Sequence, residues 1–403
     1  MKLLYITVSM PFGEYESFFI PEVQEMIRQG CDMLIVQRSP DGDCYNRDAA
    51  GLDKRSVRRP LLNVEILATA LAVALRRPIR TFRAFRRLFH CGSLMTFLKN
   101  IAVFPKSLWI ARLARKWGAE HIHAQWAMTT GTMGMIASEV SGIPWSCTLH
   151  RGDIVENNLL AAKLKHASFV RFIANDGIAI AESLCGRPLQ GNVFVLHSCV
   201  DMPPQIAFRE TLSTPPVLLC AAFLHERKGH QYLIEAVRLL RDSGVTVKLL
   251  IAGHGALQAA LERQTAECGL QDQIAFLGRV EHSRLLDMFR TGQVDLVVLP
   301  TLHEGIPAGL IEPMAYGVPV LSTRVGGVPE LLDGDAGVMV PPRDPAALAD
   351  AIRRIIADAE LRQTLVQNGR KRVEEGWAVQ PVVAELLRRI GQFTEKHAPL
   401  DRP

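Results

Sequence analysis

Two glutamates, Glu304 and Glu312, stand on either side of the start of an expected helix in the second half of the chain. Residues 296–332 read LVVLPTLHEGIPAGLIEPMAYGVPVLSTRVGGVPELL. An apolar strand ends at Pro300, and a glycine-containing loop leads into a helix that carries Glu312. The first turn of a helix points free N–H groups outward and attracts anions. Carboxylates beside such a terminus do not bind a phosphate, but they accept hydrogen bonds from sugar hydroxyls. A diphosphate with a hydroxyl-rich group on each side is a nucleotide sugar, and we expect the segment to bind one.

A simpler interpretation of a carboxylate at this place is stabilisation of the helix dipole. It accounts for one glutamate, but not for both together with the glycines. Serine-hydrolase chemistry finds little support, because neither Ser198 nor Ser322 lies near an obvious His or Asp partner.

The apolar pattern predicts the elements that position these residues. Short apolar runs alternate with amphipathic segments of helix length along most of the chain. The expected strands of the first half are Leu3–Val8, Met33–Gln37, His121–Gln125, Trp145–Leu149, Phe169–Ala174 and Val193–Leu196. Those of the second half are Val217–Phe223, Val245–Ala252, Ile274–Leu277, Asp295–Leu299, Pro319–Ser322 and Gly337–Val340. Such alternation is typical of parallel sheets covered by helices on both faces.

Two series of this kind predict an α/β protein of two doubly wound, Rossmann-like domains that face each other across a cleft. The break is expected at 201–216, where Pro203, Pro204, Pro215 and Pro216 interrupt regular structure. The predicted domains are 1–200 and 217–376, with a C-terminal helix in 377–403. Ligands of open parallel sheets bind beyond the carboxyl ends of the strands, so chemistry is expected there.

The composition is that of a globular chain, with 48% hydrophobic and 22% charged residues among 403. A net charge of +5 does not argue for nucleic acid. The eight cysteines are scattered, without metal-ligand spacing, and we expect buried reduced thiols. The N-terminal apolar run is too short for a signal peptide, and the 15-residue stretch Leu61–Leu75 is too short and too polar to span a bilayer. We therefore expect a cytoplasmic protein.

Residues 54–90 form a strongly basic segment, with ten Lys or Arg against one acid, Glu65. On a single helix, Arg76, Arg80, Arg83 and Arg87 would share one face, while Phe82, Phe85 and Phe89 would line another. A basic amphipathic helix can lie on an anionic membrane surface. The alternative is a solvated basic face whose aromatic rings pack on the domain core.

The block around the two glutamates resembles a known family. Seven residues separate Glu304 from Glu312, and the sequence continues with PMAYGVPV and, from Gly326, GGVPE. This pattern is similar to the signature of family 4 glycosyltransferases of GT-B fold, which retain the anomeric configuration of the sugar. Weaker matches follow in family order over nearly the whole chain: HSCVD at 197–201, AFLHERKG at 222–229, IAGHG at 251–255 and FLGRV at 276–280. In the N-terminal half, ESFFI at 16–20 and TLHRGDI at 148–154 resemble a bacterial exopolysaccharide branch of colanic-acid type.

The resemblance implies a donor site in the second domain. Glu304 would contact the hydroxyls of the donor sugar, and Glu312 the ribose of the nucleoside. The N–H groups of Ala308 and Gly309 would hold the diphosphate, with Ile306 and Pro307 completing the loop. Val280 would present its backbone to the base.

Further roles are implied at the reaction centre. Lys228 would neutralise the β-phosphate of the leaving group. His150 would lie at a strand end of the acceptor-side first domain, near the donor sugar, and Gly13 would let the backbone approach the phosphate. The C-terminal helix would pack back toward the first domain. No metal or other cofactor is expected, because a lysine and a helix terminus can carry the leaving group's charge.

Each of these residues also has an ordinary interpretation. Lys228 would then be a surface lysine at a helix start, His150 a strand-end histidine bonded to backbone, and Gly13 a turn residue. His121 and His123 follow strand periodicity and are expected to be structural. The chain departs from the family pattern at Phe223, where a second cation usually helps to neutralise the diphosphate. Arg227 and Arg279 are the candidates to replace that cation.

The leading hypothesis is hexose transfer from a UDP- or GDP-sugar to a glycan, free or lipid-linked, in cell-surface polysaccharide synthesis. Attachment to the inner face of the cytoplasmic membrane through residues 54–90 would suit a lipid-linked acceptor. Two alternatives remain at this point. One is a non-catalytic member that binds a glycan or a partner enzyme, and the other is a different GT-B enzyme such as a sugar-nucleotide epimerase or a phosphorylase.

Overall fold

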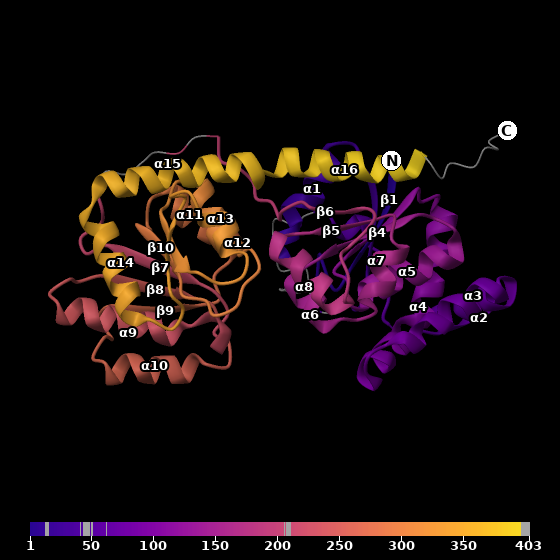
Figure 1. Cartoon of the computed structure of the whole chain (residues 1–403), viewed down its shortest axis with the longest axis horizontal. Helices are drawn as coiled ribbons and strands as arrows, with labels where there is room; N and C mark the ends of the chain where they lie inside the picture. Colours follow the sequence, from indigo (N-terminus) through magenta and orange to yellow (C-terminus); the bar gives the residue numbers. More distant parts are fainter. Residues whose placement is uncertain are drawn as a thin grey trace. The chain divides into compact units, whose positions relative to one another are not determined.

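The chain divides into two compact units in a computed structural model that describes residues 1–12, 16–40, 42, 49, 51–61, 63–204, 206 and 211–395. One unit is Met1–His197 together with the C-terminal segment from Gln380, and the other is Ser198–Val379. His197 and Val379 each lie three residues from the ends expected at 200 and 376. Each unit contains one sheet with helices around it (Figure 1).

The first unit holds a six-stranded sheet in the order β2-β1-β3-β4-β5-β6, and every pair of neighbours is parallel. Its strands are β1 Lys2–Thr7, β2 Asp32–Gln37, β3 His121–Gln125, β4 Trp145–Leu149, β5 Phe169–Phe172 and β6 Val193–Val195. All residues of β3, β4 and β5 are buried, as expected of strands covered on both faces.

The second unit holds a six-stranded parallel sheet in the order β12-β11-β10-β7-β8-β9. Its strands are β7 Val217–Ala221, β8 Lys248–Ala252, β9 Ile274–Gly278, β10 Leu296–Leu299, β11 Val320–Thr323 and β12 Val338–Val340. Both sheets confirm the predicted fold class of two doubly wound, Rossmann-like halves.

The helices of the first unit are α1 Ile20–Arg28, α2 Val64–Arg76, α3 Pro78–Arg87, α4 Leu94–Trp117, α5 Thr129–Ser141, α6 Arg151–Glu156, α7 Leu160–His166, α8 Asn175–Cys185 and α16 Val379–Glu395, whose first residue belongs to the second unit. Those of the second unit are α9 His230–Asp242, α10 Gln258–Glu267, α11 His282–Arg290, α12 Ala308–Ala315, α13 Val328–Leu332, α14 Pro345–Ala357 and α15 Ala359–Gly376. Asp344 and Asp358 cap α14 and α15 through side-chain bonds to N–H groups three residues on.

The C-terminal helix α16 packs on the first unit through aromatic and cation–π contacts. Phe393 lies 5.7 Å from Phe169, measured between ring centroids, and the Arg389 guanidinium lies 3.7 Å from the ring of Phe194. These contacts join the end of the chain to β5 and β6.

The basic segment is not one helix. It breaks at Arg77, between α2 and α3, because Pro78 occupies the first position of α3 and cannot continue the hydrogen bonding of α2. The expected single face shared by Arg76 and the three arginines of α3 is therefore wrong. The aromatic residues also differ from one another. Phe85 packs on Phe104, whereas Phe82 is 65% exposed and Phe89 is 64% exposed although its ring meets Phe97.

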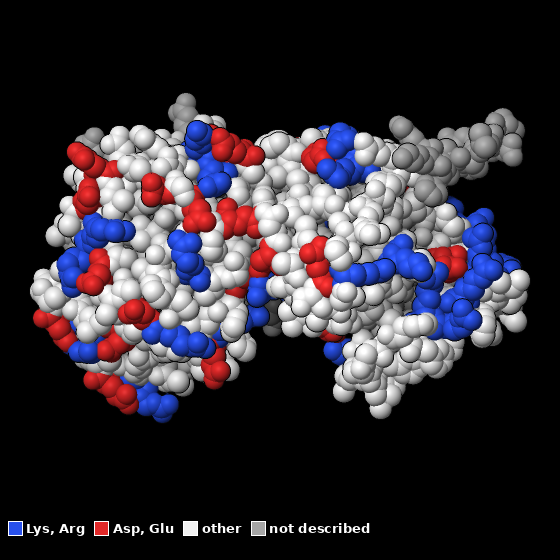
Figure 2. All heavy atoms as spheres, viewed as in Figure 1, with Lys and Arg blue, Asp and Glu red and all other residues white. Residues whose placement is uncertain are grey.

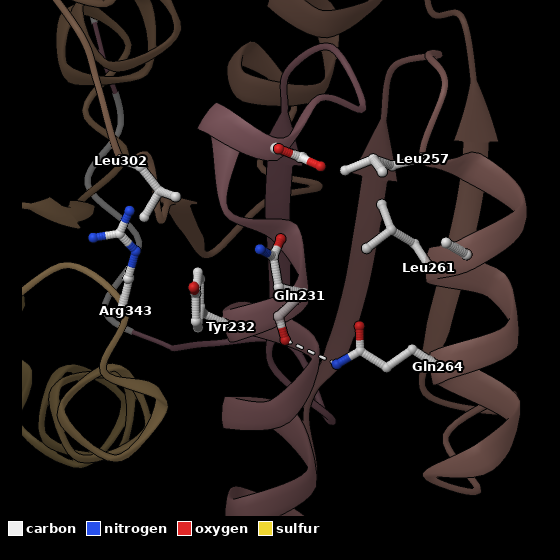
Figure 3. Close-up of a pocket in the computed structure, with 9 residues that line it drawn as sticks. Gln231, Tyr232, Leu257, Leu261, Gln264, Leu302 and Arg343 are labelled. Atoms are coloured by element: carbon white, nitrogen blue, oxygen red, sulfur yellow. Dashed lines mark hydrogen bonds between the residues drawn. The ribbon is translucent and has the colours of Figure 1, made fainter.

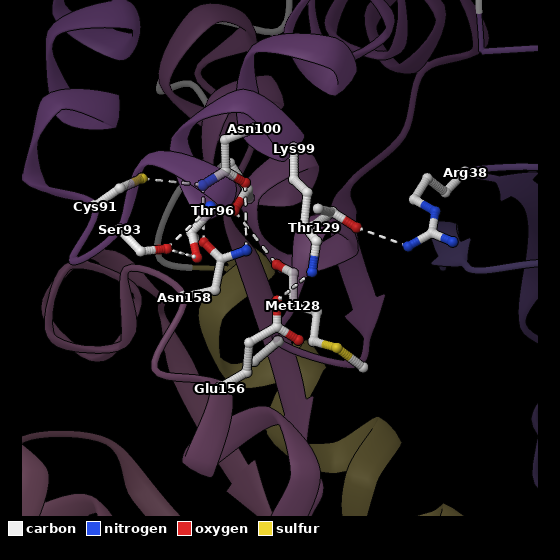
Figure 4. A network of polar contacts seen from close by, with 12 residues as sticks. Arg38, Cys91, Ser93, Thr96, Lys99, Asn100, Met128, Thr129, Glu156 and Asn158 are labelled. Atoms are coloured by element: carbon white, nitrogen blue, oxygen red, sulfur yellow. Dashed lines mark hydrogen bonds and ion pairs between the residues drawn. The ribbon is translucent and has the colours of Figure 1, made fainter.

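The long helix α4 is tied to the body of the first unit by a buried polar network (Figure 4). Asn100 donates its side-chain amide to Asn158 at 2.8 Å, and Lys99 lies 3.5 Å from Glu156. Nearby, Arg38 donates to the hydroxyl of Thr129 at 3.0 Å. Because both asparagines are buried, α4 is held in a defined position relative to the chain around α6.

The cysteines that the structure describes are all free thiols, four of them buried. Cys44 lies outside the described residues. Within the described ranges, no helix combines the length and apolar character needed to cross a bilayer.

Candidate functional site

The candidate site of the second unit lies where its strand order reverses. β8 and β9 continue the sheet on one side of β7, while β10 lies on the other side. The segments that leave β7 and β10 therefore diverge at their carboxyl ends and open a place for a ligand. Lys228 follows β7 and Glu304 follows β10, so the fold brings together two residues that are 76 positions apart.

Lys228 and Glu304 form a close ion pair at this point. Lys228 Nζ donates to Glu304 Oε2 at 2.5 Å, and the two side chains are only 14% and 19% exposed. With each charge balanced by the other, a cation and a carboxylate can stay together in a half-buried place. A phosphate that approaches the lysine and a hydroxyl that approaches the glutamate would replace this pairing with new charge-assisted bonds.

Backbone contacts fix Lys228 beside the loop of Glu304. The hydroxyl of Thr301 and the N–H of Leu302 both donate to the carbonyl of Arg227, at 3.0 and 2.7 Å. Gly229, with φ of 70°, passes so close to Pro300 that a Cβ would lie 2.0 Å from the Pro300 carbonyl oxygen. Only glycine fits this approach, and it lets the chain enter α9 with Lys228 directed toward Glu304.

The N-terminus of α12 lies directly after this pair. Pro307 is the residue before the helix, and its carbonyl accepts from the N–H of Leu310 at 3.0 Å. Ala308 and Gly309 form the first turn, whose N–H groups have no partner within the helix. Ile306 is buried below the loop, where it meets Gly327. The structure thus places all four loop residues at one helix end, as the sequence predicts.

Glu312 lies one turn further along α12 and contacts a residue that sequence reasoning missed. His282 Nε2 lies 2.7 Å from Glu312 Oε1. His282 is the first residue of α11, and Val280 lies two positions before it in the segment that follows β9. The predicted base-contacting loop and the predicted ribose-contacting carboxylate are therefore neighbours. A single histidine without a motif gave no signal before the fold was known.

Phe223 lies just after β7, where the resemblance would place an arginine. Its ring meets His254 edge-on, with centroids 5.3 Å apart, and it is 36% exposed. Arg227, one of the two candidates for a substitute cation, follows later in the same segment, and its side chain is exposed. An imidazole therefore lies against the side chain at this position.

A separate pocket of about 350 Å³ opens between α9 and α10 (Figure 3). Gln231, Tyr232, Leu257, Leu261 and Gln264 line it, and Gln264 donates to the carbonyl of Gln231 at 3.0 Å. None of the three predicted acidic and basic site residues of this unit lines it. The hollow is therefore distinct from the place that the ion pair marks.

In the first unit, His150 directly follows β4 and is packed among aromatic rings. Its ring centroid lies 4.2 Å from that of Trp126 and 5.3 Å from that of Phe19. The side-chain oxygen of Gln125 accepts from Tyr5, so its amide nitrogen, 3.3 Å from His150 Nε2, is the donor of that pair.

Trp126 holds an uncommon backbone conformation beside His150. Its φ is 75°, in the left-handed region that bulky residues rarely adopt. The indole Nε1 donates to Glu16 at 2.7 Å, and Glu16 also accepts from the N–H groups of Val8, Ser9 and Met10. One buried carboxylate therefore organises the chain after β1 and the chain after β3 together.

Comparison with known proteins identifies the family. Residues 204–372 match the model of the family described as glycosyl transferases group 1. The amylovoran biosynthesis glycosyltransferase AmsK of Erwinia amylovora is 32% identical over 393 residues, which cover 88% of this chain and 90% of that protein. The chain belongs to the glycosyltransferase group 1 family. The prediction of a glycosyltransferase is thereby confirmed.

Two further similar proteins illustrate a shorter match and a likeness of fold. The α-D-kanosaminyltransferase of Streptomyces kanamyceticus is 33% identical over 161 residues, and the matched part spans only 41% of its length. The crystal structure of HepE from Anabaena in complex with UDP has a TM-score of 0.72 and 16% identity, covering 97% of this chain and 100% of HepE. This last likeness supports the GT-B architecture.

Two predictions for the glycosyltransferase concern Gly13 and the absence of a metal ion. Gly13 lies outside the described residues. In the part of the chain that the structure describes, no group of three or more His, Cys, Asp or Glu side chains gathers closely enough to hold a metal ion.

His121 and His123 are buried and share the hydroxyl of Ser146, which is the structural role expected of them.

The Glu16 cluster carries a stability prediction. Glu16→Gln replaces one acceptor oxygen with an NH₂ group that would face backbone donors. We expect a loss of about 2–4 kcal/mol of unfolding free energy from unpaired buried donors. Urea unfolding followed by circular dichroism measures it. The matched control is Glu267→Gln on the exposed face of α10, which should change little; equal losses in both variants would contradict the role of Glu16.

The environment of His150 predicts that the protein loses folding stability in acid. Burial, with a smaller effect of Arg171, lowers the pKa of His150 to about 3, from an unperturbed 6.5. Because the folded-state pKa lies below the unfolded one, the stabilisation is full above pH 6.5 and is lost as the pH falls toward 3. His150→Gln should therefore lose less stability than the parent protein between pH 7 and pH 4. Parallel stability–pH curves for the two proteins would refute this assignment.

Proposed function

We propose that this glycosyltransferase transfers a hexose from a UDP- or GDP-sugar to a glycan, with retention of the anomeric configuration. The observation that carries the proposal is the Lys228–Glu304 pair at the switch point of the second sheet, directly before the N-terminus of α12. A cation, a helix terminus and two carboxylates are what a nucleoside diphosphate sugar requires. In support, HepE, which has the same fold, binds UDP.

The proposed division of roles follows from the contacts among these residues. The diphosphate would lie at the first turn of α12, against the N–H groups of Ala308 and Gly309, with Lys228 beside its β-phosphate. Glu304 would then exchange its lysine for sugar hydroxyls. Glu312, whose Oε1 lies 2.7 Å from His282 Nε2, would accept from the ribose, and the backbone of Val280 would meet the base.

The reaction would break the bond between the anomeric carbon and the β-phosphate oxygen. The acceptor hydroxyl oxygen would form the new bond on the same face of the sugar, and its proton would pass to the departing phosphate. Lys228 and the helix terminus would stabilise the charge that develops on that phosphate. No metal is part of this proposal. His150 stays a proposed catalytic residue, and its neutral ring would bond a sugar hydroxyl.

The acceptor is proposed to be a growing cell-surface glycan, free or lipid-linked. AmsK, which aligns over 90% of its length, is named for the biosynthesis of amylovoran. By this likeness the present glycosyltransferase would extend a bacterial exopolysaccharide in the cytoplasm.

A peripheral position on the membrane is part of the proposal. Helix α2 exposes large apolar side chains along one face, with Leu67, Leu71 and Leu75 exposed by 47%, 63% and 73%. The exposed apolar residues continue through Ile79 and Phe82 of α3. Figure 2 shows Lys and Arg gathered over this part of the first unit, beside a lobe that is almost free of charge. An apolar face bordered by cations is suited to the interface of an anionic bilayer.

One assay tests the transfer and separates it from the alternatives. The purified protein is incubated with UDP- and GDP-hexoses, with and without a glycan acceptor, and the released nucleoside diphosphate and altered sugar are measured. Acceptor-dependent release that Glu304→Ala abolishes supports the proposal. Conversion of the donor without an acceptor would indicate an epimerase, and no binding of either nucleotide would indicate a non-catalytic member.

A further inference from the structure

The stretch from residue 66 to residue 119, which contains α3, α4 and all of α2 after its first two residues, has no Asp or Glu. It holds Arg76, Arg77, Arg80, Arg83, Arg86, Arg87, Lys99, Lys106, Arg112, Arg115 and Lys116. Arg87 pairs with Glu139 and Lys99 with Glu156, both from outside the stretch, and so large an excess of positive charge repels itself unless further counter-charge is supplied. Transfer from a donor at the second unit makes no use of these cations.

The arginines of three helices converge on two adjoining hollows. One, of about 560 Å³, is lined by Arg76, Arg77, Arg80, Arg83 and Arg115 together with the end of α5, and the other, of about 380 Å³, by Arg76, Arg77, Arg112, Arg115 and Lys116. Arg76, Arg77 and Arg115 line both. No carboxylate lines either hollow, and within the described residues no ion pair is recorded for any of these cations.

The carbonyl groups at the end of α5 hold two of these arginines in place. Arg77 donates to the carbonyl of Val140 at 2.7 Å, and Arg115 donates to that of Ser141 at 3.2 Å. Gly142 then leaves the helix with φ of 83°, and a Cβ there would lie 3.1 Å from a guanidinium nitrogen of Arg80. The absent side chain gives Arg80 its room. Burial, reinforced by Arg115 and Arg80, lowers the pKa of Arg77, which shows how closely the cations crowd.

Guanidinium groups gathered around a hollow without acids, two of them held by backbone carbonyls, match the oxygens of a phosphate. The hollow also begins at Pro78, Ile79 and Arg80, the first turn of α3, which adds the partial positive charge of a helix terminus. Arginines from several directions need a group with oxygens on several sides, which a terminal phosphate or diphosphate offers and a phosphodiester does not.

The surroundings identify the source of that phosphate. Ile79, which lines the larger hollow, is 69% exposed, and Leu75, immediately before Arg76, is 73% exposed. The phosphate site is therefore continuous with the exposed apolar face of α2 and α3. We propose that the hollow lined by Arg76, Arg77, Arg80 and Arg115 binds the terminal phosphate or diphosphate of a lipid whose chains lie along that face.

This inference goes beyond the proposed transfer and rests only on the proposed membrane attachment. It replaces a diffuse attraction between cations and an anionic surface with one site that recognises a particular head group. The site differs from the donor site, because it lies in the first unit and needs no nucleotide.

The test compares two kinds of vesicle of equal zeta potential, phosphatidylcholine with phosphatidic acid and phosphatidylcholine with phosphatidylglycerol. Phosphatidic acid ends in a phosphomonoester, whereas phosphatidylglycerol carries only a phosphodiester. We expect the full-length protein to bind the phosphatidic acid vesicles on the order of ten-fold more tightly. Arg76→Gln/Arg80→Gln should remove this preference, since both side chains line the hollow.

Arg86→Gln is the matched control, because Arg86 is exposed on α3 and lines neither hollow. It should weaken binding to both vesicles alike and keep the preference. Thermal unfolding establishes that the variants are folded. A parent protein without the preference, or a double variant that keeps it, would overturn the proposal. Tight binding of inorganic pyrophosphate without any vesicle preference would assign the hollow to a free phosphate instead.

The experiment also separates this inference from the earlier ones. If the parent protein binds neither vesicle at low salt, both the membrane attachment and the lipid site fail. If it binds both equally, only the lipid site fails. Transfer to a soluble acceptor should be unchanged in the double variant, since these arginines lie outside the donor site.

Discussion

Replacement of Lys228 with alanine is expected to lower the rate of sugar transfer by about 10²–10³-fold. Lys228 Nζ bonds Glu304 at 2.5 Å, and among the residues that the structure describes no second lysine or arginine forms an ion pair with that carboxylate. When the donor loses its sugar, the β-phosphate gains negative charge, and the half-buried lysine stabilises it more than water would. The measurement is steady-state release of UDP or GDP with an acceptor present.

Two further variants show whether the effect belongs to Lys228 itself. Lys228→Arg keeps the charge but changes its shape, so it should recover part of the rate. Arg227→Ala removes an exposed neighbouring cation and should change the rate by less than about ten-fold. If Arg227→Ala is as damaging as Lys228→Ala, then Arg227 has taken over the function of the cation missing at Phe223, and the expected small effect of Arg227→Ala is wrong.

Gly229→Ala should destabilise the second unit strongly although it removes no functional atom. A Cβ there would lie 2.0 Å from the Pro300 carbonyl oxygen, at φ of 70°. The left-handed conformation costs about 1–2 kcal/mol for alanine, and the overlap adds about 1–3 kcal/mol. Relief of the overlap would move Lys228 away from Glu304, so the transfer rate should fall as well.

Gly244→Ala is the control that separates the two costs. Gly244 also has a left-handed φ, 82°, but nothing lies within 4 Å of its Cβ position. The Gly244→Ala variant should lose only the conformational part of the unfolding free energy and keep its transfer activity. Denaturant unfolding and a transfer assay of both variants decide the matter, and equal losses in the two would contradict the argument from close approach.

The sheets could be predicted from the sequence because parallel strands covered on both faces are continuous apolar runs. The predicted runs His121–Gln125 and Trp145–Leu149 have the bounds of β3 and β4, and Ile274–Leu277 differs from β9 by one residue. The loop from Ile306 to Gly309 was also placed correctly at a helix start. Local patterns sufficed here, since a strand, a glycine loop and a helix are adjacent in sequence.

The contacts between distant segments could not be predicted in the same way. The bond of Lys228 to Glu304 depends on β7 and β10 being neighbours in the sheet. The apolar pattern predicts the strands but not their order. His282 belongs to no motif, yet it contacts Glu312. Glu16 was quoted only within a resemblance, although it gathers N–H groups from one loop and the indole of Trp126 from another.

The basic segment shows a failure of a different kind. Helical periodicity predicts one continuous helix through Arg77, but Pro78 follows and ends α2. The arginines still converge, but around a hollow between three helices rather than along one face. The cations of α4 that line these hollows lie outside the basic segment of residues 54–90.

The central claim is that the N-terminus of α12, with Lys228, Glu304 and Glu312, binds a nucleoside diphosphate. Calorimetric titration of UDP and of GDP into the parent protein and into Lys228→Ala tests it most directly. One of the two nucleotides should bind the parent protein, and the variant should bind it at least about ten-fold more weakly. Binding of neither nucleotide, or equal affinity in the two proteins, would contradict the account.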